Sequence, residues 1–67
     1  REESIVRLAY TTADKVHQSH KSILLEPMNP FERRLIHTTL NDIPDIETKS
    51  EGEGLYKQVR VIYKGLF

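Results

Sequence analysis

Two residues of this chain combine side-chain types and a spacing that suit binding chemistry. Arg33 and His37 lie four positions apart in a segment with the pattern of a helix, and side chains at this spacing project one above the other from one helix face. A guanidinium presents a planar fork of N–H donors that matches a phosphate, and an imidazole adds a donor that becomes cationic near neutral pH. The pair predicts a small anion-binding patch, whose affinity should increase from about pH 8 to about pH 6 as His37 gains a proton.

Other basic side chains are secondary candidates for phosphate contacts. Each of them is more often a solvated charge than a ligand contact. The pair itself has a similar alternative: on spacing alone, Arg33 and His37 could simply be part of a solvated helix face. Arg60 is the best placed, since we expect it on a central strand with its side chain facing away from the helices. The secondary candidates are Lys21, Arg34, Lys49, Lys57 and Arg60.

Aromatic side chains can add stacking contacts with nucleobases. Tyr56 lies beside a predicted turn and is the aromatic residue best suited to this role. Tyr63 alternates in phase with Val59 and Val61, so we expect it in the core. With three tyrosines, two phenylalanines and no tryptophan in the chain, any stacking surface should be small.

The sequence offers little support for catalysis, for a metal site or for a cofactor. His17 and His20 lie three positions apart at the end of a predicted helix, but no third ligand is evident near them. The chain has no cysteine, no glycine-rich phosphate loop and no serine in a nucleophile-elbow context. We therefore expect a protein that is not an enzyme and that binds neither a metal nor a cofactor.

Length, charge and composition limit what the chain can be. Its 67 residues predict a single domain. Ten basic and ten acidic residues give a net charge of zero, so nucleic-acid binding would depend on local segregation of charge and should be weak and salt-sensitive. No apolar run approaches a membrane span and no signal peptide is recognisable, which predicts a soluble cytoplasmic module. The chain opens at Arg1 and its only methionine is Met28, so we expect a fragment of a longer protein.

The start of the helix that carries the pair follows from local chemistry. Asn29 is a preferred N-cap, Pro30 suits the first helical position, and Glu32 stands three residues after the cap, where its side chain can reach back. The apolar stripe expected on this helix leaves His37 on the exposed side and Arg33 at the edge of the stripe, beside the neighbouring sheet.

Apolar periodicity divides the chain into five elements and one turn. Three strands with two helices predict an α+β two-layer sandwich, with both helices on one face of a three-stranded sheet. The last two strands should form an antiparallel hairpin, and a right-handed crossover would place the last strand between the other two. In order we expect a helix from Glu2 to about Ser19, a strand from Ser22 to Glu26, a helix from Pro30 to about Asn41, a strand from Ile46 to Ser50, a turn from Glu51 to Gly54, and a strand from Leu55 or Tyr56 to about Lys64.

The segments LEPMNPFERRLIHTTL, IETKSEGEG and VRVIYK carry a family resemblance. In them the chain resembles the R-three-H domains, a family named for an arginine and a histidine separated by three residues, and in particular the C-terminal domain of the bacterial Jag (SpoIIIJ-associated) RNA-binding proteins. The resemblance implies a domain that binds single-stranded RNA or DNA, with the signature residues, here Arg33 and His37, near a bound phosphate. It also implies a KH domain just before this one in the parent chain.

Two places depart from the pattern of that family. His20 and Lys21 stand where the family often has a glycine between the first helix and the first strand. Lys57 and Gln58 stand where it often has a pair of arginines entering the last strand. The second departure lowers the basic charge expected around the site, which bears on affinity more than on the fold.

A hypothesis from a different class is a protein-interaction or dimerisation module without nucleic-acid binding of its own. The neutral net charge favours it, and the open edges of the sheet would supply the contact surface. Apolar residues that we expect to be exposed would add to it, namely Leu24, Ile62, Leu66 and Phe67. Salt separates the two hypotheses, because phosphate binding weakens as salt rises and apolar association does not.

Overall fold

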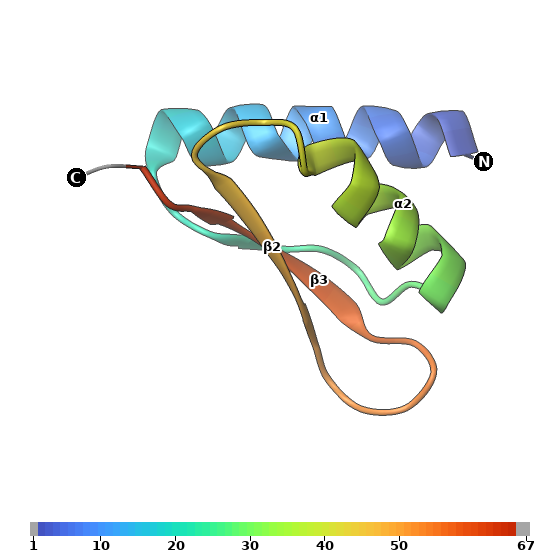
Figure 1. Ribbon diagram of the computed structural model, residues 1–67. Helices are drawn as coiled ribbons and strands as arrows, with labels where there is room; N and C mark the ends of the chain where they lie inside the picture. The colour runs from blue at the N-terminus through green and yellow to red at the C-terminus, as the bar shows by residue number, and fades with distance from the viewer. Residues whose placement is uncertain (1, 66–67) are drawn as a thin grey trace.

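Both helices of the computed structural model lie on the same face of a three-stranded sheet (Figure 1). The structure describes residues 2–65. In chain order the elements are α1 (Glu2–Ser19), β1 (Ile23–Leu24), α2 (Pro30–Leu40), β2 (Ile46–Glu51) and β3 (Gln58–Tyr63). This arrangement confirms the predicted α+β fold class. No helix among the described residues is both long and apolar enough to cross a membrane.

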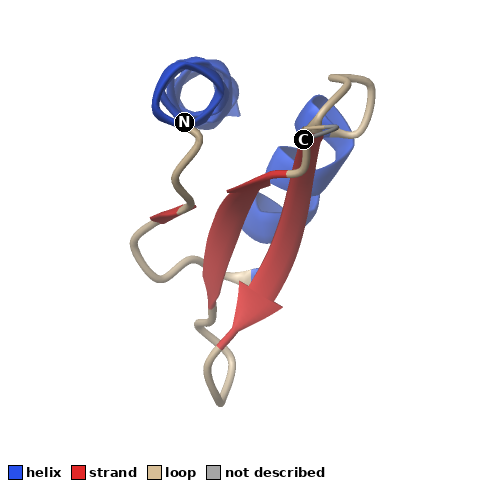
Figure 2. Cartoon of the chain, turned by 90° about the vertical axis from the view of Figure 1, so that its left-hand side faces the viewer, coloured by secondary structure: helices blue, strands red, loops and turns tan. Residues whose placement is uncertain are grey.

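The sheet is built around β3, as predicted. The strand order is β1-β3-β2, and both neighbours run antiparallel to β3, with the long β2–β3 hairpin seen in Figure 2. Thr48 pairs with Val61, and Ser50 pairs with Val59. Because directly paired residues project from the same face of a sheet, Thr48 and Ser50 share the helix-covered face with the two valines.

One apolar core fills the space between the helices and the sheet. Val59 and Val61 of β3 and Ile36 of α2 have 0% of their surface exposed and lie at its centre. A chain this short can bury only one small core, so its stability depends on few side chains. The other members of the core are Ile5, Ala9, Ala13, Val16, Leu25, Met28, Leu40 and Ile46.

The apolar residues that we expected to be exposed differ in their burial. Leu24 on β1 is exposed, as predicted. Ile62 on β3 is half-buried, because its strand lies at the centre of the sheet with a neighbour on each side. Leu66 and Phe67 lie outside the described residues.

β1 is shorter than predicted. It covers Ile23–Leu24 instead of Ser22 to Glu26. Beyond it, the N–H groups of Leu25 and Met28 still donate to carbonyls of Val59 and Lys57, each over 2.9 Å. Pro27 has no N–H to donate, so these bonds remain isolated and do not extend the strand.

β3 begins later than predicted, at Gln58 instead of Leu55 or Tyr56. The carbonyl of Leu55 accepts a hydrogen bond from the Arg33 side chain, and residues 52–57 form a loop. β2 continues to Glu51, one residue beyond its predicted end at Ser50. The turn predicted from Glu51 to Gly54 therefore begins at Gly52 instead, and its glycines at positions 52 and 54 have φ of 109° and 81°, a backbone that glycine adopts at little steric cost.

The residue directly after α1 is a histidine in the left-handed conformation that glycine usually supplies at this position. His20 has φ of 61°, and its N–H donates to the carbonyl of Val16 over 2.7 Å. Its ring stacks on Tyr63, with centroids 4.1 Å apart and planes inclined by 2°. Tyr63 itself is half-buried and packs against the core, as predicted. The stacking contact helps to hold His20 in a conformation that its side chain disfavours.

α2 begins with the predicted capping box. The N–H of Glu32 donates to Oδ1 of Asn29 over 2.8 Å, and the N–H of Asn29 donates to Oε1 of Glu32 over 3.3 Å. Pro30 occupies the first helical position, as expected. Since these bonds fix where the helix starts, they also fix the direction in which each later side chain of α2 projects.

Replacing Asn29 with alanine should lower the free energy of unfolding by about 1 kcal/mol, because the substitution removes the side-chain acceptor at the start of α2. Asn41→Ala is the matched control, since Asn41 is an exposed residue at the C-terminal end of the same helix. Urea unfolding followed by circular dichroism measures both changes. An equal loss of stability in the two variants would contradict the role assigned to the cap.

Candidate nucleic-acid interface

Arg33 is held in place by two backbone carbonyls. Its side chain is half-buried beside the start of α2. Nε donates to the carbonyl of Met28 and Nη2 donates to the carbonyl of Leu55, each over 3.1 Å. One guanidinium therefore joins α2 to the segment before it and to the β2–β3 loop. As predicted, Arg33 emerges beside the sheet, at the loop that connects two of its strands.

The guanidinium of Arg33 retains free donors after these contacts. It has five N–H groups, of which the carbonyls accept two. The remaining three have no acceptor among residues 2–65, and they include at least one on each of the two Nη atoms. A pair of donors on neighbouring nitrogens is what a forked contact with phosphate requires. The partners of Arg33 are neutral carbonyls, so its positive charge is not cancelled locally.

His37 faces β2 and not open solvent. Its Nδ1 lies in hydrogen-bond contact with Oγ1 of Thr48, and its Nε2 lies 3.2 Å from Oγ of Ser50. The side chain is half-buried, whereas the sequence pattern placed it on the exposed side of the helix. The prediction of its position was wrong because the strand approaches α2 closely on this side. His37 therefore connects α2 to the helix-covered face of β2.

The surroundings of His37 favour the neutral form of its imidazole. Burial lowers the pKa of His37 from its ordinary value of 6.5, and the positive charge of Arg33 lowers it further. A neutral ring can donate through one nitrogen and accept through the other, and hydroxyl groups serve either role. The lowered pKa therefore disfavours the cationic form of His37 that the sequence predicted near neutral pH. We now expect no gain in affinity from His37 between about pH 8 and pH 6.5.

The sheet face that the helices do not cover, here called the open face, carries cations that are already paired with carboxylates. Arg60 projects from central β3 as predicted, and its guanidinium binds both carboxylate oxygens of Glu51, over 2.6 and 3.1 Å, and Oγ of Ser22 over 3.2 Å. The hydrogen bonds from Arg60 lower the pKa of the Glu51 carboxyl. Lys49 lies 3.8 Å from a carboxylate oxygen of Glu47. These carboxylates reduce the pull of Arg60 and Lys49 on a phosphate.

The remaining predicted candidates divide between two places. Arg34 is exposed on α2 next to Arg33, and Lys57 is half-buried where its backbone pairs with Met28. Lys21 is exposed directly before Ser22, which Arg60 contacts, and so lies near the open face of the sheet. Arg34 and Lys57 thus lie on the two segments that the Arg33 side chain joins, whereas Lys21 precedes a residue that the paired Arg60 contacts.

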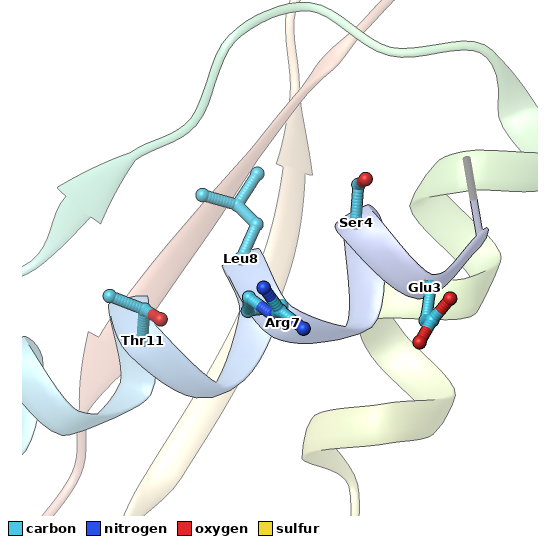
Figure 3. A pocket seen from close by; sticks show the side chains of 5 residues that line it. All are labelled: Glu3, Ser4, Arg7, Leu8 and Thr11. Carbon is cyan, nitrogen blue, oxygen red and sulfur yellow. The ribbon is translucent and has the colours of Figure 1, made fainter.

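A shallow pocket of about 450 Å³ lies along the first half of α1 (Figure 3). All of its lining residues come from this single helix, and none is a predicted site residue. Among residues 2–65, no group of three or more His, Asp or Glu side chains is placed to hold a metal ion. The pocket is lined by Glu3, Ser4, Arg7, Leu8 and Thr11.

Fold and site together define a small α+β domain with an arginine–histidine pair, in which no carboxylate among residues 2–65 neutralises the arginine. Residues 3–63 match the sequence profile of the R-three-H domain, and the chain belongs to this family. The resemblance stated from the sequence is thereby confirmed.

Two curated relatives of this chain share the same protein name. The chain is 41% identical over 64 residues to the "RNA-binding protein KhpB" of Clostridium symbiosum, a match that covers 96% of this chain and 29% of that protein. It is also 41% identical over 66 residues to the protein of that name from Bacillus subtilis (strain 168), covering 96% of this chain and 32% of that protein. The chain thus spans about a third or less of the length of these relatives.

Sequence reasoning missed the partners that hold the pair. Thr48 and Ser50 alternate with charged residues and follow the buried Ile46, a pattern that signals a shared inner face. That signal was available, but it did not reveal which helix residue would meet the hydroxyl groups. The sequence could not show that the carbonyls of Met28 and Leu55 bind Arg33, because every residue has a backbone carbonyl.

The lowered pKa of His37 makes stability depend on pH. Because unfolded His37 takes up a proton more readily than folded His37, its contribution is intact above about pH 6.5 and is lost as pH falls through the lowered folded pKa. The free energy of unfolding should therefore fall from about pH 7 to about pH 5, and part of this fall should be absent in His37→Asn. Urea unfolding at several pH values measures it. Parallel pH profiles for the two proteins would refute this account of His37.

Proposed function

We propose that this domain binds single-stranded RNA or DNA through a phosphate contact at Arg33, with little sequence preference, as one module of a larger bacterial RNA-binding protein. The observation that carries the proposal is the guanidinium of Arg33, which two carbonyls orient and no described carboxylate neutralises. Family membership and the relatives named as RNA-binding proteins support it. The same features favour a binding function over catalysis.

In this mechanism Arg33 and His37 have different tasks. Arg33 donates a forked pair of N–H groups to one backbone phosphate, and its plane is already set before the ligand arrives. His37 remains neutral and holds α2 against β2 through Thr48 and Ser50, which keeps Arg33 in position beside the β2–β3 loop. Contacts of this kind position a strand and carry no information about its bases.

The other cations add diffuse attraction of unequal strength. Arg34 follows Arg33 on α2, and Lys57 lies on the loop that Arg33 contacts, so we expect these two to contribute most. Lys49 and Arg60 contribute less because carboxylates accompany them, and Lys21 acts only on a strand that extends toward the open face of the sheet.

Weak binding by this domain gains strength in a longer chain. We propose a preceding KH domain as the second module, in a cytoplasmic protein. Two linked modules bind one strand more tightly than either alone, because the second contact forms at a high effective concentration. The relatives, about three times as long as this chain, leave room for such a module.

Arg33→Lys should weaken binding of a short oligouridine by about tenfold at low salt, because a lysine keeps the charge but cannot form the fork. Arg7→Lys is the matched control, since Arg7 is an exposed arginine on the other helix, α1. Fluorescence anisotropy with labelled RNA measures both affinities, and an NMR spectrum confirms that each variant is folded. Unchanged affinity in folded Arg33→Lys would remove Arg33 from the mechanism.

Salt dependence tests phosphate binding against the interaction-module hypothesis, which is favoured by the outer edge of β2, a strand with no second neighbour among residues 2–65. If two or three phosphates are contacted, the logarithm of the affinity should fall with the logarithm of the salt concentration with a slope of about −1.4 to −2.1. The same anisotropy titration at several salt concentrations gives the slope. A slope near zero, together with self-association in sedimentation without RNA, would favour the interaction module.

A further inference from the structure

Three large exposed apolar side chains lie on two segments, the start of α2 and the β2–β3 loop, which are together called the apolar corner. Phe31 in the first turn of α2 is 60% exposed, and Leu55 and Tyr56 in the β2–β3 loop are 63% and 59% exposed. Two other large apolar side chains among residues 2–65 are exposed elsewhere, Tyr10 on α1 at 54% and Leu24 on β1 at 40%. The corner therefore concentrates three of five such side chains.

Hydrogen bonds bring these two segments together. Met28, three residues before Phe31, forms a backbone bridge with Lys57, the residue after Tyr56. Arg33 then binds the carbonyl of Met28 and the carbonyl of Leu55 with a single side chain. The β2–β3 loop consequently lies beside the start of α2, as the ribbon shows (Figure 1). The guanidinium that carries the proposed phosphate site is also the group that holds the apolar corner together.

We propose that Phe31, Leu55 and Tyr56 form a stacking site for a nucleobase of the strand whose phosphate Arg33 binds. The inference rests on the proposed function and extends it, since it assigns a base contact where the phosphate contact alone has none. Aromatic rings stack on any base, because every base has a flat π-face. The site therefore favours nucleic acid that is single-stranded without selecting a sequence.

The neighbouring charge identifies a nucleotide as the occupant. The apolar corner adjoins the free N–H donors of Arg33 through Leu55, whose carbonyl the guanidinium holds. A nucleotide carries a phosphate and a flat base within one residue, so it can satisfy both features at once. An apolar peptide or a second copy of the chain would cover Phe31 and Tyr56 but would leave the arginine donors without a phosphate.

The decisive experiment compares two ligands with the same phosphates, a short oligodeoxythymidine and an abasic oligomer of equal length. Fluorescence anisotropy at low salt should show the abasic oligomer binding about tenfold more weakly to the wild-type domain, since it lacks the stacked base. Equal affinity for the two oligomers would overturn the stacking site while leaving the phosphate contact of Arg33 intact. Failure of both oligomers to bind would overturn the stacking site and the proposed function together.

Substitutions at the corner localise the effect. Tyr56→Ala should weaken oligodeoxythymidine binding about five- to tenfold and leave abasic binding unchanged, whereas Tyr56→Phe should retain both affinities because the ring makes the contact. Tyr10→Ala is the matched control, since it removes a similarly exposed tyrosine that lies on α1 and not in the β2–β3 loop. NMR spectra establish that the variants are folded. A Tyr56→Ala variant that binds both oligomers like the wild-type domain would refute the proposal. So would a wild-type domain that forms a dimer, does not bind nucleic acid, and loses the dimer in the Tyr56→Ala variant.

Discussion

The position of β3 constrains every other part of this domain. It pairs with a strand on each side, and its inner valines, Val59 and Val61, are fully buried under the helices. Because side chains alternate along a strand, burying these valines determines which residues of β2 face α2. In the observed register Thr48 and Ser50 do so. A register shifted by one residue would present charged side chains to His37 instead, and the contacts that join α2 to the sheet would be lost.

Within that frame, the start of α2 determines the site. The capping bonds at Asn29 fix the phase of the helix, and from there Arg33 reaches two carbonyls that lie on different loops. A side chain that is already held loses less conformational freedom when a ligand binds, so its hydrogen bonds contribute more to affinity. The contacts that stabilise the loop arrangement and the contacts that orient the guanidinium are therefore the same contacts.

The sequence predicted the parts of this structure that local chemistry decides. The N-cap at Asn29, both helices and the central place of the last strand follow from residue type, periodicity and chain connectivity. The late start of β3 could not be predicted in this way, because it depends on the Leu55 carbonyl meeting an arginine from another element. The lowered pKa of His37 could not be predicted for the same reason, because the burial of its ring depends on Thr48 and Ser50, which lie 11 and 13 positions further along the chain.

Net charge says little about phosphate binding in a domain of this size. The acidic residues are not spread evenly, and Glu47 and Glu51 accompany Lys49 and Arg60 on the open face of the sheet. On the side of α2, Arg33 has carbonyl partners, which orient it without cancelling its charge. A neutral chain thus contains a cation that is both fixed and uncompensated. Because the long-range field around such a domain is weak, the proposed phosphate contact depends on the geometry of a few fixed donors.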